Sequence, residues 1–154
     1  AESYGGTTRA DIEKMVEEAC AAYGRRVKAL QSNHEGAILD FLQENRAEAR
    51  GAILNPGALS HTSHALHDCL KALPFPAVEV HLSNVHAREE WRARDLVAPA
   101  TRGQVVGLGP MGYYFAAVWL CSQLVEQPAD AAEGDAIEVP PEELQPVTGG
   151  EYEG

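Results

Sequence analysis

Glu79 and His81 stand two residues apart in Ala-Val-Glu-Val-His, where an apolar strand is predicted to end. Residues at positions i and i+2 of a strand project from the same face, so the carboxylate can orient the imidazole and stabilise its positive charge. A histidine held in this way transfers protons. The pair therefore predicts acid–base chemistry at the end of this strand.

The elements that must position this pair alternate between helix and strand. Helices are predicted at about residues 9–23, 37–49, 61–73, 87–94 and 112–125, and strands at 27–31, 52–55, 77–82 and 104–108. Thr8 and Asp11 have the spacing of a helix capping box. Short apolar strands separated by helices are typical of an α/β fold, a parallel sheet with helices on both faces.

Polar residues follow three of these strands at the edge where ligands bind. In open parallel sheets that edge lies beyond the carboxyl ends of the strands. The polar endings occupy residues 32–36, 55–63 and 81–89, and they are rich in Asn, His and Ser. One such ending alone is typical of a solvated loop, but the three together predict a ligand site on this edge.

Two other motifs are better explained by packing than by ligand binding. Gly107-Leu-Gly-Pro-Met-Gly112 has the spacing of a dinucleotide-binding loop, but its helix leads into a polar tail instead of a second strand. We interpret it as a tight turn with close helix packing. His61, His64 and His67 spread over about 120° of helix surface, which does not direct three nitrogens at one ion. No metal site is predicted.

The net charge of −11 comes mainly from the end of the chain. Nine of the 23 acidic residues follow Val125, where there is no Lys or Arg. Residues 1–125 therefore carry 14 acidic and 12 basic residues, which gives no strongly basic face for nucleic-acid phosphates or anionic lipid. Neither nucleic acid nor a membrane is a predicted partner.

Cysteine usage and the absence of long apolar runs predict a cytoplasmic protein. Cys20, Cys69 and Cys121 are odd in number and lie among apolar residues, which is typical of buried thiols in a reducing compartment. The longest apolar run, from Tyr113 to Cys121, is too short to span a bilayer, and no signal-peptide pattern opens the sequence.

Five blocks of sequence, in order, resemble the type II 3-dehydroquinases. They are Tyr4-Gly-Gly-Thr-Thr, Gln31 to Gly36, Ile53 to Ser63, Glu79 to Glu90, and Gly107-Leu-Gly with Gly112-Tyr113. The resemblance spans about residues 2–125. It implies a flavodoxin-like domain that assembles as trimers into a dodecamer. It also implies dehydration of 3-dehydroquinate to 3-dehydroshikimate, in the shikimate or quinate pathway, without a metal or organic cofactor.

The resemblance assigns the chemical steps to four residues. Tyr4 resembles the base that removes a proton beside the ketone, and His81 resembles the acid for the departing hydroxyl group. Asn55 matches the residue that helps to hold a water at the enolate oxygen, and Glu79 supports His81. A phenol, with an ordinary pKa of about 10, needs a nearby positive charge to act as a base at neutral pH. The family supplies this charge with an arginine.

Three residues at or after the end of the predicted 77–82 strand resemble substrate contacts near the pocket mouth. Leu82 and Ser83 match the pair whose backbone N–H groups hold the substrate carboxylate. Arg88 is placed like an arginine at the mouth of the pocket, although a solvated helix face would also explain it.

Three more residues resemble contacts to the ring hydroxyls and to the trimer interface. They are Arg92, His61 and, from a neighbouring subunit, Asp68. Other interpretations stay open for each: a solvated helix face for Arg92, a helix cap for His61 and an ordinary surface acid for Asp68.

The sequence begins inside a loop of the family pattern. That pattern places a strand, and an arginine five residues before Tyr4, upstream of Ala1. In a sheet ordered 2-1-3-4-5 this first strand is the central one, so without it strand 27–31 would face the others across about 10 Å. We expect an upstream extension or a separate segment to fill the gap, because unpaired strand edges are prone to aggregation.

Residues 126–154 are predicted to form an acidic tail after an α/β domain of residues 1–125. The tail is rich in proline and glycine and poor in large apolar residues, so it cannot bury enough surface to offset its chain entropy. We expect it to be mobile in an isolated subunit. Its candidate docking residues are Ile137, Val139 and Leu144.

Three classes of function remain open from the sequence. The preferred hypothesis is an active hydro-lyase. The second is a non-catalytic homologue that keeps the pocket as a binding or scaffold module, and a flavin-binding protein of similar fold is a distant third. Residues upstream of Ala1 would separate the first two, because a strand followed by an arginine favours the enzyme.

Overall fold

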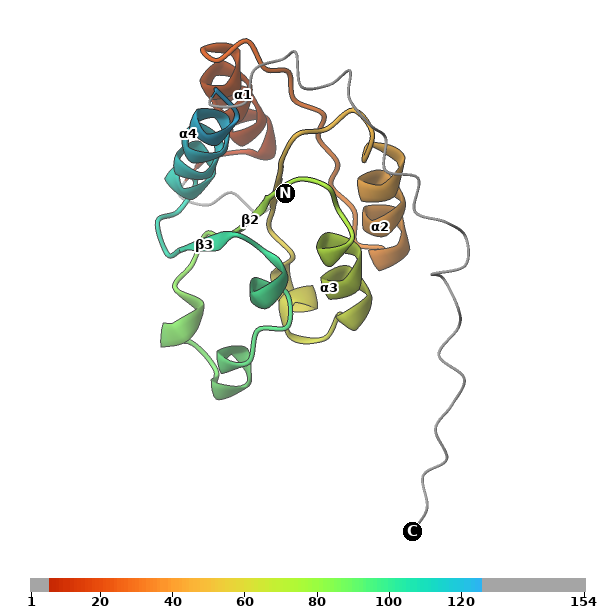
Figure 1. Cartoon of the computed structure of the whole chain (residues 1–154). Coiled ribbons are helices and arrows are strands. Elements are labelled where there is room, and N and C mark those ends of the chain that lie inside the picture. The colour runs from red at the N-terminus through yellow and green to blue at the C-terminus, as the bar shows by residue number, and fades with distance from the viewer. Residues whose placement is uncertain (1–5, 126–154) are drawn as a thin grey trace, which may run out of the picture.

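The computed structural model describes residues 6–125, which form a parallel sheet between two layers of helices (Figure 1). The helices are α1 (Arg9–Ala21), α2 (Glu35–Glu44), α3 (His64–Lys71) and α4 (Met111–Val125). The strands are β1 (Ala52–Leu54), β2 (Ala77–His81) and β3 (Gly103–Val106). The connections contain the short 3-10 helices η1 (Gly57–His61), η2 (Val85–Ala87), η3 (Glu90–Ala93) and η4 (Ala98–Ala100).

β2 lies between β1 and β3 in the described sheet, and both pairings are parallel. The register places Glu79 of β2 beside Leu54 of β1 and beside Gln104 of β3. All five residues of β2 are buried. The prediction of a parallel α/β sheet with helices on both faces is therefore confirmed.

The alternation of β2 divides the core between the two faces of the sheet. Val78 and Val80 pack with Ala116 and Leu120 of α4, and α1 packs beside α4 in a cluster that Ile53 of β1 also contacts. Ala77 packs on the other face with α3, beside which α2 lies (Figure 1). Glu79 and His81 alternate in step with Ala77, so their side chains belong to the α3 face.

The start of α1 is fixed by the predicted capping box. The Thr8 hydroxyl oxygen accepts the Asp11 N–H at 3.2 Å, and the Asp11 carboxylate accepts the Thr8 N–H at 2.8 Å. Each residue satisfies a backbone N–H group that the first turn leaves without a helical partner. Thr8 and Asp11 are only three residues apart in the sequence, so their spacing alone could predict where the helix begins.

The glycine motif after β3 serves packing, as predicted. Gly107 and Gly109 have φ values of +83° and +57°, which glycine adopts readily. A Cβ on Gly112 would lie 3.1 Å from a Val80 methyl and 3.3 Å from a Val105 methyl. The glycines therefore make the turn into α4 and let this helix lie close against the sheet.

The prediction of a strand at Val27–Gln31 is wrong. The structure assigns no strand to this segment. Val27 packs against the α1 and α4 core, and the Lys28 ammonium donates to Asn45 and Glu48, at 2.8 Å in each case. A strand is defined by hydrogen bonds to a neighbouring strand. Within residues 6–125, no strand of the sheet pairs with this segment.

Several helix boundaries also differ from the predictions. α2 begins at Glu35 and ends at Glu44, where the Asn45 side chain donates to the Phe41 carbonyl at 2.8 Å. The predicted 61–73 helix begins only at His64, because Ser63 caps it and residues 57–61 form η1. The predicted 87–94 helix is replaced by the two short turns η2 and η3.

The three cysteine residues are free thiols and are buried, as predicted. None of the described helices is long and apolar enough to cross a membrane. The predictions for Tyr4, for the tail and for its docking residues Ile137, Val139 and Leu144 fall outside the described residues.

Candidate active site

Glu79 and His81 form a buried hydrogen-bonded pair at the carboxyl end of β2. The His81 Nε2–H donates to Glu79 Oε1 at 2.6 Å, and the two side chains are 5% and 0% exposed respectively. Because both side chains leave the strand on one face, the short separation follows from their spacing. A charge-assisted hydrogen bond of this length fixes the imidazole orientation, as proton transfer requires. The predicted juxtaposition is confirmed.

Two residues that the sequence analysis missed complete the surroundings of this pair. Gln104 Nε2 donates to Glu79 Oε2 and to Asp95 Oδ2, at 2.9 Å in each case. Asp95 Oδ2 also lies 3.9 Å from His81 Nε2. Gln104 is the register partner of Glu79, so only knowledge of the strand pairing would have identified it.

Glu79, His81 and Asp95 are the described residues that could together hold a metal ion. They offer one ligand atom each, and these atoms lie within 4.8 Å of one another. Carboxylate and imidazole ligands suit zinc. In this arrangement, however, the ligand atoms bond to one another and to Gln104, so a metal would have to displace those hydrogen bonds.

The loop after His81 holds the residues predicted to bind a carboxylate. Leu82 and Ser83 are half-buried, and the Leu82 carbonyl accepts the Gly109 N–H at 3.0 Å. The Asn84 side chain accepts the His86 N–H at 3.2 Å and caps η2. Arg88 is exposed and donates from Nη1 to the Ser83 hydroxyl at 3.4 Å. The structure thus brings the Arg88 guanidinium to the Leu82–Ser83 loop, and its predicted place at the mouth of the pocket stays a prediction.

Arg92 is not on a solvated helix face. Its side chain is only 14% exposed, lies 4.0 Å above the Trp91 ring and donates from Nε to Glu89 at 2.6 Å. The hydrogen bond from Arg92 is the main cause that lowers the pKa of Glu89. The guanidinium is therefore held in one place by a carboxylate and an aromatic ring.

His61 lies next to Trp91 and is not the cap of α3. The two rings meet edge to face with centroids 5.1 Å apart. His61 Nδ1 donates to the Arg94 carbonyl at 2.8 Å, whereas Nε2 is buried without a hydrogen-bond partner among the described residues. Because the His61 ring is fixed through Nδ1 and its buried Nε2 has no partner in the described part of the chain, Nε2 is suited to hydrogen-bond a ligand hydroxyl group.

Asn55 directly follows β1, at the same edge of the sheet. Its side-chain oxygen accepts the Gly57 N–H at 3.1 Å, and its amide lies beside the Tyr113 hydroxyl. Burial raises the pKa of Tyr113, and the hydrogen bond with Asn55 opposes this effect. Tyr113 was not predicted as a site residue.

Asp68 is exposed on α3, and both of its predicted interpretations, a contact from a neighbouring subunit and an ordinary surface acid, remain predictions.

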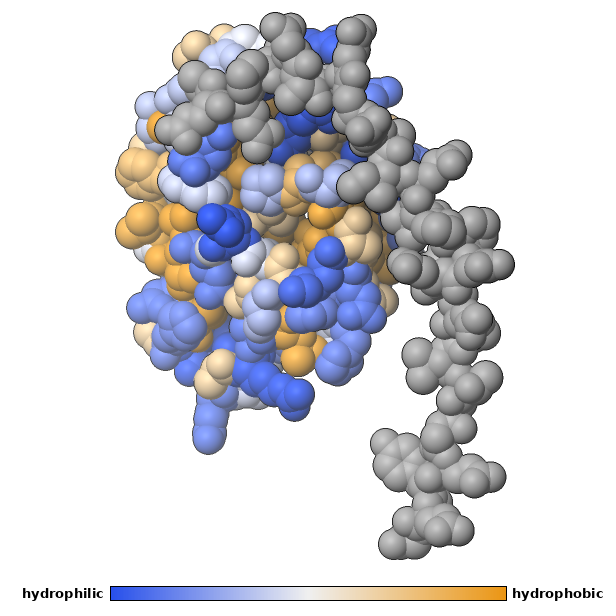
Figure 2. Space-filling view, in the orientation of Figure 1, coloured by the Kyte–Doolittle hydropathy of each residue, from blue (hydrophilic) through white to orange (hydrophobic). Residues whose placement is uncertain are grey.

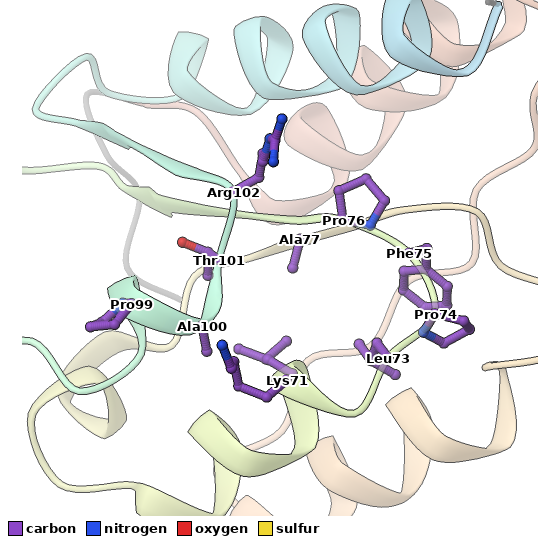
Figure 3. A pocket seen from close by; sticks show the side chains of 11 residues that line it. Lys71, Leu73, Pro74, Phe75, Pro76, Ala77, Pro99, Ala100, Thr101 and Arg102 are labelled. Atoms are coloured by element: carbon purple, nitrogen blue, oxygen red, sulfur yellow. The ribbon is translucent and has the colours of Figure 1, made fainter. Parts of the chain in front are cut away.

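A pocket of about 430 Å³ lies at the opposite edge of the sheet (Figure 3). It is formed where β2 begins and by the segments that precede β2 and β3, and its lining includes Leu73, Phe75, Ala100 and the basic residues Lys71 and Arg102. The lining contains no His, Cys, Asp or Glu. The described part of the lining therefore lacks the carboxylate and imidazole groups that gather at the carboxyl edge.

Comparison with known proteins identifies relatives along most of the chain. The family described as "Dehydroquinase class II" matches residues 1–121. A protein named "3-dehydroquinate dehydratase 1" from Agrobacterium fabrum is 51% identical over 113 residues, which cover 73% of this chain and 78% of the relative. A 3-dehydroquinate dehydratase from a Chelativorans species is 49% identical over 122 residues, or 79% and 84% of the two chains.

Solved structures show the same relationship. The type II dehydroquinase from Propionibacterium acnes has a TM-score of 0.72 and 34% identity, with 77% of this chain and 82% of that chain covered. The type II dehydroquinase from Butyrivibrio crossotus has a TM-score of 0.72 and 39% identity, with coverage of 76% and 82%. The match to residues 1–121 and these identities place the chain in the class II dehydroquinase family.

Proposed function

We propose that this protein is a hydro-lyase that dehydrates 3-dehydroquinate to 3-dehydroshikimate in the shikimate or quinate pathway. The observation that carries the proposal is the buried Glu79–His81 pair at the carboxyl end of β2. The pair occurs in a chain whose sequence is 51% identical over 113 residues and 49% identical over 122 residues to two proteins named for this reaction. A hydrogen-bonded carboxylate and imidazole supply the acid that the elimination needs.

The reaction is an anti elimination through an enolate. Tyr4 takes the proton from the carbon beside the ketone, and the electron pair of that C–H bond forms the enolate. Asn55 helps to hold a water at the enolate oxygen. His81 then gives a proton to the departing hydroxyl group, which leaves as water while the carbon–carbon double bond forms. Glu79 orients the imidazole and stabilises its charge.

The remaining site residues bind the substrate. The Leu82 and Ser83 backbone N–H groups hold its carboxylate, and Arg88 lies at the pocket mouth. His61 and Arg92 contact the ring hydroxyls, a role that the buried His61 Nε2 and the fixed Arg92 guanidinium support. Neither a metal nor an organic cofactor takes part in this chemistry.

Association with other copies of the chain, as trimers in a dodecamer, is part of the proposal. The resemblance implies that Asp68 of a neighbouring subunit reaches the site. Association is supported by apolar side chains exposed to 37–54% on and beside α4, namely Leu108, Met111, Tyr114, Phe115 and Trp119. Figure 2 shows apolar surface beside β3 and the start of α4. The buried free thiols support a cytoplasmic location.

Incubation of the purified protein with 3-dehydroquinate tests the proposal. We expect the ultraviolet absorbance of the conjugated enone product to rise in proportion to protein concentration, and EDTA to leave the rate unchanged. Binding without a rise in absorbance would favour the non-catalytic alternative, and bound visible chromophore would favour the flavin alternative. Activity lost to EDTA and restored by zinc would contradict the metal-free reaction.

A further inference from the structure

Gln104 lies between two carboxylates and touches both. Its amide nitrogen is 2.9 Å from Glu79 Oε2 and 2.9 Å from Asp95 Oδ2. A primary amide has two N–H donors, so a single Gln104 side chain can satisfy one oxygen of each acid. Glu79 in turn uses its other oxygen, Oε1, to accept the hydrogen bond from His81.

The fold fixes both ends of this arrangement. Gln104 and Glu79 are register partners on β3 and β2, so their side chains lie side by side on the same face of the sheet. Asp95 is held by the backbone, because its Oδ1 accepts the Val97 and Ala98 N–H groups, at 2.9 Å in each case. Gln104 therefore connects the catalytic strand to the loop that leads into η4.

Electrostatics explains why a neutral donor is suited to this position. Asp95 Oδ2 lies 3.9 Å from His81 Nε2, so two carboxylates approach one imidazole. Like charges at this range repel, and hydrogen bonds from a shared donor reduce the cost of bringing them together. A lysine here would compete with the imidazole for Glu79, and an apolar side chain would leave the buried Oε2 without a partner.

We propose that Gln104 and Asp95 are positioning residues for His81. Gln104 holds the Glu79 carboxylate so that Oε1 meets the imidazole, and Asp95 anchors Gln104. Neither residue is assigned a contact with the reacting atoms. The effect on turnover rests on the proposed dehydratase function, whereas the effect on the Glu79–His81 hydrogen bond can be measured without it.

The test compares Gln104→Leu with the wild-type protein by two readouts. The first is kcat and KM with 3-dehydroquinate. The second is the proton NMR signal of the imidazole N–H in the Glu79–His81 hydrogen bond. We expect kcat to fall on the order of 10- to 100-fold with KM nearly unchanged, because a misplaced catalytic group slows the chemical step without weakening substrate binding. We expect the imidazole signal to broaden or move upfield.

A matched control and a second variant keep the test decisive. Gln123→Leu makes the same change on α4, where the Gln123 amide donates a hydrogen bond only to Ser122 at 3.4 Å among the described residues, and should behave as the wild type. Asp95→Asn keeps an oxygen for the Val97 and Ala98 N–H groups but removes the charge. It should show the same two effects to a smaller extent, even if Gln104→Leu does not fold.

The outcomes separate this inference from the proposed function. An unchanged imidazole signal and unchanged kcat in folded Gln104→Leu and Asp95→Asn would overturn the positioning role while leaving the dehydratase intact. If the wild type does not turn over 3-dehydroquinate, the imidazole signal alone decides whether Gln104 and Asp95 position His81. A broadened or upfield-shifted signal in both variants supports the positioning role, and an unchanged signal contradicts it.

Discussion

At the scale of single residues, the charge on Glu79 is the feature that His81 depends on most directly. Glu79→Gln keeps the shape of the side chain but removes the negative charge that faces Nε2 at 2.6 Å. We expect kcat to fall on the order of 10- to 100-fold, because His81 remains but is no longer oriented and stabilised by a charged partner. Steady-state kinetics with 3-dehydroquinate measures the effect.

The control for this substitution is Glu90→Gln, on the exposed surface of η3. It makes the same chemical change without touching His81, so its kcat should match the wild type. Equal kcat values for Glu79→Gln and the wild type would show that the carboxylate charge has no part in turnover.

The buried thiol pair between α1 and α4 gives a prediction with a defined pH dependence. Burial, together with the hydrogen bond between the Cys20 and Cys121 thiols, raises the pKa of Cys20 to about 12, and the two sulfur atoms are 3.6 Å apart. The folded-state pKa is above the value of 9.0 for a free thiol. Its contribution to stability is therefore complete below about pH 9 and declines as pH rises toward 12.

Thiol alkylation and denaturation together check this prediction. At about pH 8 we expect iodoacetamide to modify Cys20 much more slowly in the native protein than in urea, because the thiolate is the reactive form. Between pH 8 and pH 10 the wild type should lose more unfolding free energy than Cys20→Ala. Rapid modification of Cys20 in the native protein would contradict the raised pKa.

At the scale of elements, the turn between β3 and α4 depends on Gly107. An alanine there would have to adopt a φ of +83°, and its Cβ would lie 3.1 Å from the Asn84 Cβ and 3.3 Å from the Asn84 Cα. We expect Gly107→Ala to lower the free energy of unfolding by about 1–3 kcal/mol. Because Asn84 belongs to the loop after His81, turnover should fall as well.

Gly36 provides the matched comparison for urea denaturation. It lies in the first turn of α2 without a positive φ and with no atom within 4 Å of an added Cβ. Gly36→Ala should therefore raise the unfolding free energy by about 0.4–1 kcal/mol. Equal changes in stability for the two variants would show that neither the φ of Gly107 nor its contact with Asn84 matters.

Local signals explain which elements could be predicted from the sequence. Thr8 and Asp11 are three residues apart, and Glu79 and His81 are two apart, so each pair carries its own geometry. The segment 27–31 is short and partly apolar, but whether it becomes a strand depends on a neighbour elsewhere in the chain. Composition alone cannot supply that information.

The same distinction holds within the candidate site. Asn55, Leu82 and Ser83 lie where strands end, the edge at which a ligand site was predicted, and the resemblance to the type II 3-dehydroquinases gave them their roles. Gln104 was missed because its importance comes from the register of β3 against β2, which no local pattern encodes. Asp95 was missed because it reaches Gln104 from an irregular loop.

At the scale of the whole molecule, the proposed division between residues 1–125 and the acidic tail predicts that the tail is dispensable for turnover. The residues assigned to the reaction all precede Val125. Truncation after Val125 should leave kcat within a few fold of the wild type. Light scattering during gel filtration would show whether the truncated and full chains form the proposed assembly, and an assembly formed by the full chain alone would identify the tail as an assembly element.

The most direct test of the central claim is the reaction of His81→Ala with 3-dehydroquinate in heavy water. Absorbance reports elimination, and NMR reports exchange of the proton beside the ketone. We predict that this variant still exchanges the proton but forms the enone at least about 100-fold more slowly than the wild type, because the proposal assigns His81 the role of the acid and not of the base. Enone formation by His81→Ala at the wild-type rate would contradict the account.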